Sequence, residues 1–409
     1  MSGPGDGYDR VIRDLFGRRR FGAKLDLGRV HRGLARLGSP QKHFPYVIQI
    51  GGTNGKGSTA RFVEAILTCS GVRTGLFSSP HLSHFSERFR VGAKEVSESA
   101  IVDAHRAVTS SDSEGNLTFF EICTLMGVRL FEKGQVAVAI FEVGLGGRGD
   151  ATTAIGNDIA VVTGVARDHE NVLGTELSQI AREKAAIFRR GGLGVVGDSG
   201  RAEGKKWLLQ YANEAGLRKL SVVGNGDQTR LPSHPRYQDS NAATAQAAVR
   251  MLARLGLSIS PDNMTSICAD TAIPGRFEKI GNVVLDSAHN LHGAEALADM
   301  VSSLTKPVAA VCGLSGRREA KVLAPVLEVL DDVIWTRAAV DSALPPEDLA
   351  RSAGKGDVVG CARSALAKAK EKVGASGTVL VFGSLHLVGE IRGFLIGRDA
   401  DGLQDPPSV

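Results

Sequence analysis

The residues best suited to chemistry form the stretch Gly52-Thr53-Asn54-Gly55-Lys56-Gly57-Ser58-Thr59, which follows a β-branched, apolar run. Glycines let backbone N–H groups converge on an anion, and the start of a helix adds partial positive charge. Lys56 supplies a charge for the β- and γ-phosphates, and Ser58 or Thr59 supplies a hydroxyl for Mg²⁺. The pattern predicts an ATP site, although Gly57 breaks the usual G-x-x-x-x-G-K-[ST] spacing and a plain glycine turn is the competing interpretation.

Polar residues also stand at the ends of two later apolar runs, at residues 136–143 and 159–165. The carboxyl ends of parallel strands lie at one edge of a sheet, where ligands bind. We therefore expect Glu142 to bring a carboxylate to Mg²⁺ beside Ser58, with His169 as a nitrogen ligand or Asp168 as an alternative oxygen. Taken singly, Glu142 could be a charge at a strand end and His169 a capping residue, but their joint placement favours a metal–nucleotide site.

Further candidate residues lie later in the chain. Lys184 falls on a helix predicted over residues 176–189, where a lysine most often belongs to a solvated helix face. Asp286 and His289 follow a strand predicted at 283–286, and Arg276 sits at a predicted hinge. An Arg, an Asp and a His delivered by a second domain would let domain closure complete the nucleotide site.

The elements that position these residues alternate between strands and helices, which predicts a doubly wound α/β fold. A change to Ser, Pro, Asp and Asn at 256–275 places a boundary between a P-loop domain, residues 1–270, and a smaller Rossmann-like α/β domain, residues 271–409. Residues 22–45 carry one helical face before the first strand, and residues 398–409 read as a frayed tail. The predicted strands are 47–50, 73–77, 136–143, 159–165, 193–197, 283–286, 308–312, 333–336, 358–360 and 379–382, and the main helices are 61–70, 118–131, 176–189 and 240–255.

Composition narrows the class of protein without choosing a function. The 409 residues exceed a comfortable single domain, and 43% hydrophobic with 23% charged residues describe an ordinary globular protein. A net charge of +5 suits polyanionic small molecules as well as nucleic acid. The five cysteines are widely spaced, residues 1–10 lack a signal-peptide core, and no apolar run approaches the ~20 residues of a membrane span. We expect a cytoplasmic protein with reduced thiols and neither a nucleic-acid nor a membrane partner.

A series of motifs runs through nearly the whole chain. They are Leu25-Asp26-Leu27-Gly28-Arg29-Val30, Gly52 to Ser58, Ser79-Pro80-His81-Leu82, Phe120-Glu121, Glu142-Val143-Gly144-Leu145-Gly146-Gly147-Arg148, Asp168-His169, Leu173-Gly174, Glu183-Lys184-Ala185, Gln238-x-x-Asn241-Ala242-Ala243, Pro274-Gly275-Arg276-Phe277-Glu278, Asp286-x-Ala288-His289-Asn290 and Gly383-Ser384-Leu385-x-Leu387-Val388-Gly389-Glu390. In type and order these motifs resemble the Mur ligase superfamily, and specifically the folylpolyglutamate synthase/dihydrofolate synthase family.

The resemblance implies an ATP-dependent amide ligase. ATP would phosphorylate the carboxylate of dihydropteroate or a reduced folate, and the amino group of L-glutamate would attack the acyl phosphate, releasing phosphate beside ADP. It also implies two Mg²⁺ sites, a monovalent cation, and a monomer that takes small-molecule substrates. The folate would lie along residues 25–36 and the loop after Ser78.

The resemblance further assigns roles to single residues. Lys184 matches the lysine that the family carbamylates, which would convert a cation into an anion that helps hold the second Mg²⁺, while Asp286 and His289 would face the ATP or the incoming amino acid. The implied metal ligands are Ser58, Ser79, Glu142 and His169; the nucleotide contacts are Thr53, Asn54, Gly55, Lys56, Gly57, Ser58, Thr59, Asn241, Arg276 and Asp286; and the catalytic residues are Lys56, Lys184 and His289.

The sequence also departs from the family pattern. Gly316-Arg317-Arg318-Glu319 stands where an Asp-Lys-Asp cluster is usual, which bears on the amino-acid pocket, and Gly149, Thr153 and Ser287 replace other usual residues. Three alternatives remain: a Mur-type ligase of cell-wall assembly, a P-loop switch or motor that ligates nothing, and a Mur-type ligase for a non-folate carboxylate. Residues 25–29 before the P-loop argue against the first, and several metal ligands at strand ends argue against the second.

Overall fold

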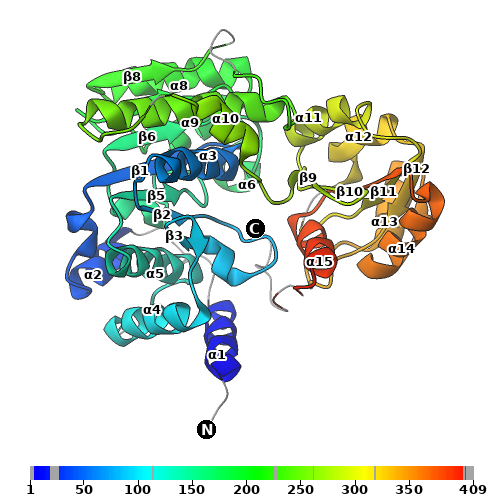
Figure 1. Ribbon diagram of the computed structural model, residues 1–409, viewed down its shortest axis with the longest axis horizontal. Helices are drawn as coiled ribbons and strands as arrows, with labels where there is room; N and C mark the ends of the chain where they lie inside the picture. The colour runs from blue at the N-terminus through cyan, green and yellow to red at the C-terminus, as the bar shows by residue number, and fades with distance from the viewer. Residues whose placement is uncertain are drawn as a thin grey trace. The chain divides into compact units, whose positions relative to one another are not determined.

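The computed structural model describes residues 4–18, 27–112, 115–224, 229–260, 262–316, 319–398 and 401. The chain forms two compact units, each with its own sheet (Figure 1). The first comprises Met1–His81 with Ser86–Thr271, and the second comprises Leu82–Phe85 with Ala272–Val409. The second unit thus takes up a short segment from the middle of the first unit's sequence, which the sequence patterns do not indicate.

The sheet of the first unit has the strand order β4-β3-β2-β5-β1-β6-β7-β8. Because β1 lies between β5 and β6, the chain winds outward from β1 in both directions, which places a ligand site at the carboxyl end of β1. The predicted doubly wound fold is confirmed, but the sheet is mixed, since β3 and β4 add an antiparallel edge. The strands are β1 (Tyr46–Gly51), β2 (Thr74–Phe77), β3 (Phe89–Val91), β4 (Lys94–Glu95), β5 (Val138–Glu142), β6 (Ile159–Val162), β7 (Leu193–Val196) and β8 (Lys219–Val222).

Successive side chains of a strand point to opposite faces of the sheet, so the strand residues show which helices cover each face. Ala160 and Val162 pack against α7 (Leu177–Ala185) and α8 (Ala202–Glu214). Glu142 is in register with Ile50, which is in register with Val161, so Glu142 points to the opposite face. On that face lies α3 (Lys56–Cys69), which packs against α9 (Tyr237–Arg254) and α10 (Met264–Asp270) (Figure 1).

The start of α5 (Phe119–Lys133) follows from a capping box. Glu121 N–H donates to Thr118 Oγ1 at 3.4 Å, and Thr118 N–H donates to Glu121 Oε2 at 2.8 Å. These bonds satisfy two N–H groups that a helix start leaves without backbone partners. The helix predicted from Thr118 is therefore confirmed.

The N-terminus contains a helix that the sequence analysis missed, α1 (Pro4–Gly17). Tyr8, Val11, Ile12 and Leu15 are buried and follow the i, i+3, i+4, i+7 spacing of one helical face. The flanking glycines and charges obscured this signal. The other helices of the unit are α2 (Leu27–Arg36), α4 (Glu98–Ser111), α6 (Glu170–Leu173) and the 3₁₀ turns η1 (Pro40–His43), η2 (Phe85–Arg88) and η3 (Ala151–Ala154).

The second unit has a six-stranded sheet of order β13-β12-β11-β14-β10-β9 with apolar clusters on both faces. One cluster joins the sheet to α11 (Leu291–Val301), α12 (Ala324–Glu328) and α13 (Pro346–Ala353), and the other joins it to α14 (Ala362–Val373) and α15 (Leu385–Ile396). Strand β9, which pairs antiparallel with β10, was not predicted. The strands are β9 (Arg276–Ile280), β10 (Val283–Asp286), β11 (Val308–Cys312), β12 (Asp332–Trp335), β13 (Asp357–Val358) and β14 (Thr378–Phe382).

The C-terminal segment is anchored at Asp401. Its N–H donates to Ser83 O at 2.9 Å, and its carboxylate accepts the Phe85 N–H at 2.6 Å. Ser83 Oγ in turn donates to Gly389 O at 2.9 Å, and Leu82 belongs to the second apolar cluster. The prediction of a frayed tail from residue 398 is therefore wrong at Asp401, while residues 402–409 lie outside the described part of the chain.

Candidate active site

The loop between β1 and α3 depends on glycine at two positions. Gly52 has φ +141° and Gly55 has φ +83°. A Cβ on Gly52 would lie 1.9 Å from Thr163 Oγ1, and one on Gly55 would lie 2.1 Å from Asn241 Oδ1. No larger residue fits either place, so the loop is held against β6 and α9 with its backbone at the carboxyl edge of the sheet. This is the geometry of a phosphate cradle.

Two lysines converge on one carbonyl of this loop. Lys56 Nζ donates to Gly52 O at 3.2 Å and to Thr53 O at 3.1 Å, and Lys184 Nζ donates to Gly52 O at 2.9 Å. Burial, and next the charge of Lys56, lowers the pKa of Lys184 to about 7, against the opposing effect of Asp168 and Asp150. Lys184 is therefore a buried residue of the loop region and not part of a solvated helix face.

The carboxylate of Glu142 ties the P-loop helix to the loop after β2. Glu142 Oε2 accepts the Ser79 N–H at 3.2 Å, and a Cβ on Gly57 would lie 3.4 Å from the same oxygen. Gly57, which breaks the usual spacing, thus leaves room at the first turn of α3 for this carboxylate. Two predicted metal ligands, Glu142 and Ser79, are brought together.

Ser58 and Thr59 differ in their surroundings. Ser58 Oγ accepts a hydrogen bond from Gln238 Nε2 at 3.2 Å, whereas Thr59 is fully buried and its hydroxyl faces Asn241 O at 3.5 Å. Thr59 thus contacts α9, which leaves Ser58 as the hydroxyl suited to a metal. The Thr53 hydroxyl is also used internally, since it bonds to both the N–H and the carbonyl of Ala166 at 3.1 Å.

His169 lies directly before α6 with φ +52°. Its Nε2 is 3.9 Å from Asp168 Oδ1, and that oxygen accepts the His169 N–H at 2.9 Å. Among the described residues, no group of three or more His, Cys, Asp or Glu is arranged to hold a metal. His169 therefore stays a predicted ligand.

A loop that the sequence analysis did not assign a role holds Lys184 in place. Buried Asp150 accepts hydrogen bonds from the N–H groups of Gly144 and Leu145, each at 3.0 Å, and from Thr152. This closes the glycine-rich loop after β5. A Cβ on Gly147 would lie 2.6 Å from Glu183 O, so the loop packs directly on the backbone of α7 beside Lys184. An aspartate at the end of a run of glycines is the sequence signal that could have identified this loop as a support for Lys184.

In the second unit, Asp286 and Arg276 are in register across β10 and β9. Asp286 is buried and its Oδ1 accepts the Ala288 N–H at 2.9 Å, while His289 Nδ1 lies 2.8 Å from Ser287 O. Arg276 is the first residue of β9, a few positions after the boundary between the two units, so its place at a hinge stays a prediction. The three residues do gather at one end of this sheet.

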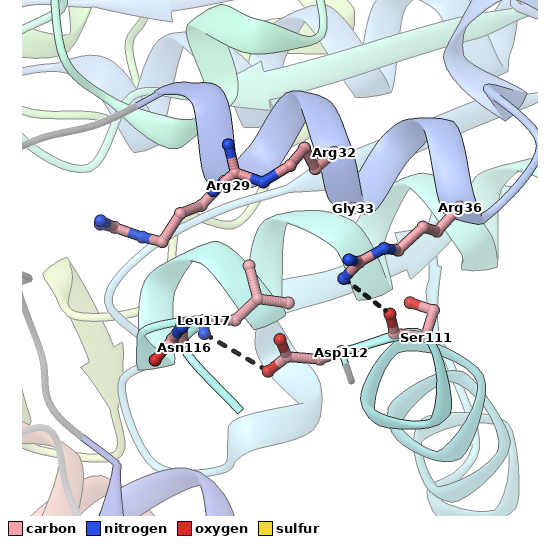
Figure 2. Close-up of a pocket in the computed structure, with 8 residues that line it drawn as sticks. All are labelled: Arg29, Arg32, Gly33, Arg36, Ser111, Asp112, Asn116 and Leu117. Carbon is pink, nitrogen blue, oxygen red and sulfur yellow. Dashed lines mark hydrogen bonds between the residues drawn. The ribbon is translucent and has the colours of Figure 1, made fainter. Parts of the chain in front are cut away.

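A pocket lies between α2, the end of α4 and the residues just before α5 (Figure 2). The three arginines of α2 that line it lie on one helical face, and Figure 2 shows them above Asp112 and Asn116. Arg29 forms a bidentate pair with Glu121, with distances of 2.8 to 3.1 Å, and Arg36 donates to Ser111 O at 3.2 Å. The lining residues are Arg29, Arg32, Gly33, Arg36, Ser111, Asp112, Asn116 and Leu117. Leu25 and Asp26 of the predicted folate segment lie outside the described residues.

Comparison with known proteins identifies the family. Residues 50–220 match the Mur ligase middle domain, and residues 275–385 match the Mur ligase glutamate ligase domain. The dihydrofolate synthase/folylpolyglutamate synthase of Escherichia coli strain K12 is 36% identical over 404 residues, covering 92% of this chain and 93% of that protein. The chain belongs to the dihydrofolate synthase/folylpolyglutamate synthase family.

Solved structures of family members have the same fold. E. coli FolC in complex with DHPP and ADP is 34% identical, with a TM-score of 0.85 over 95% of this chain and 98% of that one. A bifunctional folylpolyglutamate synthase/dihydrofolate synthase with Mn, AMPPNP and L-glutamate bound is 30% identical, with a TM-score of 0.82 over 92% and 95% of the two chains.

Two departures from the family pattern are accommodated by hydrogen bonds within the described chain. Thr153 Oγ1 donates to Gly147 O at 2.7 Å and accepts from Gln49 Nε2 at 2.8 Å, so it supports the same glycine-rich loop. Ser287 Oγ donates to Gly275 O at 3.0 Å. Arg317 and Arg318 lie outside the described residues.

Proposed function

We propose that this chain uses ATP to join L-glutamate to the carboxylate of dihydropteroate and of reduced folates, releasing ADP and phosphate. The observation that carries the proposal is the convergence of Lys56 and Lys184 on Gly52 O beside a glycine-shaped cradle, in a chain of this ligase family. A carboxylate is a poor electrophile, and phosphorylation gives it a leaving group that the glutamate amine displaces. Phosphoryl transfer chiefly requires positioning and charge neutralisation.

The cradle residues would hold the nucleotide. Backbone N–H groups between Asn54 and Ser58 would bind the phosphates, whereas the Thr59 N–H already donates to Gly55 O at 2.8 Å. Lys56, which rests on two loop carbonyls, would neutralise the transferred phosphoryl group. Asn241, packed against Gly55, would contact the nucleotide from α9. Thr53 would shape the cradle without donating to phosphate, because its hydroxyl is bonded to Ala166 and its N–H donates to Gly164 O at 2.9 Å.

The donor groups at this edge fit Mg²⁺ bound together with phosphates. Mg²⁺ in nucleotide sites uses one or two carboxylates beside phosphate oxygens, so a dense acidic cluster is not required. Glu142 supplies a buried carboxylate next to Ser79 and the first turn of α3. We assign Ser58, Ser79, Glu142 and His169 as ligands of two ions, which when bound would neutralise phosphate charge. We also assign a monovalent cation to the protein. Measuring whether turnover depends on K⁺ tests this assignment.

Lys184 would act as its carbamate. A lysine whose pKa is about 7 is largely a neutral amine at slightly alkaline pH, and only the neutral amine attacks CO₂. The ammonium form first loses one proton to solvent; the neutral amine then forms an N–C bond to CO₂ as a C=O π bond opens onto oxygen, and the nitrogen releases a second proton. The loss of two protons and the gain of CO₂ leave an anion where a cation stood. The product would help hold the second Mg²⁺.

The two units would have different roles in the reaction. We propose residues 1–270 as the ATP-binding domain with a folate segment along α2, and residues 271–409 as the glutamate ligase domain; the two domain matches support this division. Arg276 and Asp286 would contact the nucleotide, and His289 would face the ATP or the amino acid. The pocket beside Arg29 and Arg32 would lie next to the folate.

We also propose that one chain is the functional unit and that it works in the cytoplasm. No helix among the described residues is long and apolar enough to span a membrane, and all five cysteines are free thiols. Reduced thiols are usual in that compartment.

The decisive experiment measures ADP release by the purified protein with MgATP and L-glutamate, comparing dihydropteroate, tetrahydrofolate and no acceptor. Release with both acceptors is the expected result, and Lys56→Ala should abolish it. Release with neither acceptor, despite ADP binding, would refute the folate assignment and favour a non-folate carboxylate.

A further inference from the structure

A chain of hydrogen bonds leads from the loop after β7 to the first turn of α3. Ser199 Oγ donates to Asn241 Oδ1 at 2.6 Å, Asn241 Nδ2 donates to Gln238 Oε1 at 2.8 Å, and Gln238 Nε2 donates to Ser58 Oγ at 3.2 Å. In each of these three hydrogen bonds, the donor is the residue nearer Ser199 and the acceptor is the residue nearer Ser58. Ser58, Gln238 and Asn241 expose 4%, 0% and 3% of their surface, so water competes little for these bonds.

The last bond restricts what Ser58 can do. A serine hydroxyl has one O–H donor and two lone pairs. The Gln238 N–H occupies one lone pair, so the other lone pair and the O–H must point away from α9. Ser58 then has one acceptor position for a cation and one donor for a neighbouring anion, as a metal ligand beside a phosphate requires.

We infer that Gln238 is a positioning residue that orients the Ser58 hydroxyl for the metal, and that Asn241 and Ser199 hold Gln238 in that orientation. This inference rests on the metal–nucleotide site of the proposed function. It adds a role for two residues, Gln238 and Ser199, to which the sequence analysis gave none. Groups that orient a metal ligand through a hydrogen bond typically change metal affinity 10- to 100-fold when they are removed.

A packing role makes different predictions, and α9 provides a matched control. Gln246 lies on the same helix, is also buried, and bonds to Thr265 at 3.4 Å and to Arg250 at 3.2 Å. Gln246→Met therefore removes a buried amide of equal size from α9. Gln238→Met removes the donor to Ser58 and keeps the size of the side chain.

The test is a titration of Mn²⁺ into each protein–ADP complex, followed by electron paramagnetic resonance, with ADP affinity measured by calorimetry with and without the metal. We expect Gln238→Met to weaken Mn²⁺ binding about 10- to 100-fold. Its ADP affinity without metal and its Tm should match those of Gln246→Met. Ser199→Ala, at the half-buried end of the chain, should show a smaller loss in the same direction.

The outcomes separate this inference from the function on which it rests. Wild-type protein that binds ADP with no coupling to Mn²⁺ would overturn the proposed metal site and the inference together. Coupled binding in the wild type, with unchanged Mn²⁺ affinity in Gln238→Met, would overturn the inference alone. If Gln238→Met does not fold, a wild-type Mn²⁺ affinity in Ser199→Ala overturns the inference.

Discussion

Lys56 and Lys184 donate to the same carbonyl oxygen, that of Gly52, at 3.2 and 2.9 Å. Two ammonium groups on one acceptor repel each other, and Lys184 is also buried, so its neutral form is favoured. The loop that would accept the ATP phosphates thus also tunes the amine that would carry the carbamate. Anionic ligands bound beside Gly52 O would relieve the repulsion between the two ammonium groups.

Lys184 should make the stability of the protein depend on pH. Its pKa is about 7 in the folded chain and 10.5 when unfolded, so between these values the unfolded state binds more protons and stability rises with pH. Within this window the free energy of unfolding rises by about 1.4 kcal/mol per pH unit. Below pH 7 this group causes no further change. Lys184→Met should be more stable than wild type at pH 7, and the difference should shrink by pH 9.5. Urea unfolding in CO₂-free buffer measures it; a difference that does not vary with pH would contradict the assignment.

Lys184→Ala should lower turnover by at least about 100-fold, because it would remove the proposed carbamate charge that would help hold a second metal ion. Its folding should not be impaired as its turnover is, because the loss of side-chain packing is opposed by the removal of a buried amine whose pKa is lowered to about 7. With ¹³C-bicarbonate, the wild type should show a carbamate resonance that the variant lacks. Arg182→Ala, on the same helix, is the control. Turnover near the wild-type value in Lys184→Ala would mean that the lysine is a spectator.

Gly55→Ala should abolish ADP binding. The added Cβ would lie 2.1 Å from Asn241 Oδ1 in a backbone with φ +83°, so the loop must move away from α9. Gly38→Ala is a matched control, since Gly38 has φ +87° and no atom within 4 Å of the added Cβ. The control should lose about 1 kcal/mol of stability through backbone strain alone and keep its ADP affinity. Calorimetric titration with ADP compares the two; equal affinities would show that the cradle tolerates a side chain.

Glu64→Gln should destabilise the first unit by about 3–5 kcal/mol. Buried Glu64 pairs with Arg61 at 2.7 Å and with Arg90 at 2.9 Å, which links α3 to β3, and the change leaves two guanidinium groups without their counter-charge. Asp103→Asn, in an exposed pair with Arg106 at 3.4 Å, should change stability by less than about 0.5 kcal/mol. Urea denaturation of both variants tests this prediction, which fails if the two show similar losses.

The sequence by itself determined the P-loop, the places of the main strands to within about three residues and the doubly wound fold. Glycines at fixed spacing, apolar runs and the Thr118 capping box act within a few residues, so they can be read directly from the chain. Antiparallel partners such as β9 were missed, because Arg276-Phe277-Glu278 lacks a continuous apolar run and a strand on an edge need not have one.

Only the tertiary structure decided how distant residues meet. Lys184 and Gly52 are 132 positions apart, and Gln238 and Ser58 are 180 apart, so no local pattern joins them. The pKa of Lys184 depends on burial and on Lys56, both of which arise when α7 packs beside the P-loop. The uptake of Leu82–Phe85 by the second unit likewise follows from contacts with Gly389 and Asp401 at the far end of the chain. Long-range packing sets these contacts because many weak interactions, and not one motif, bring the elements together.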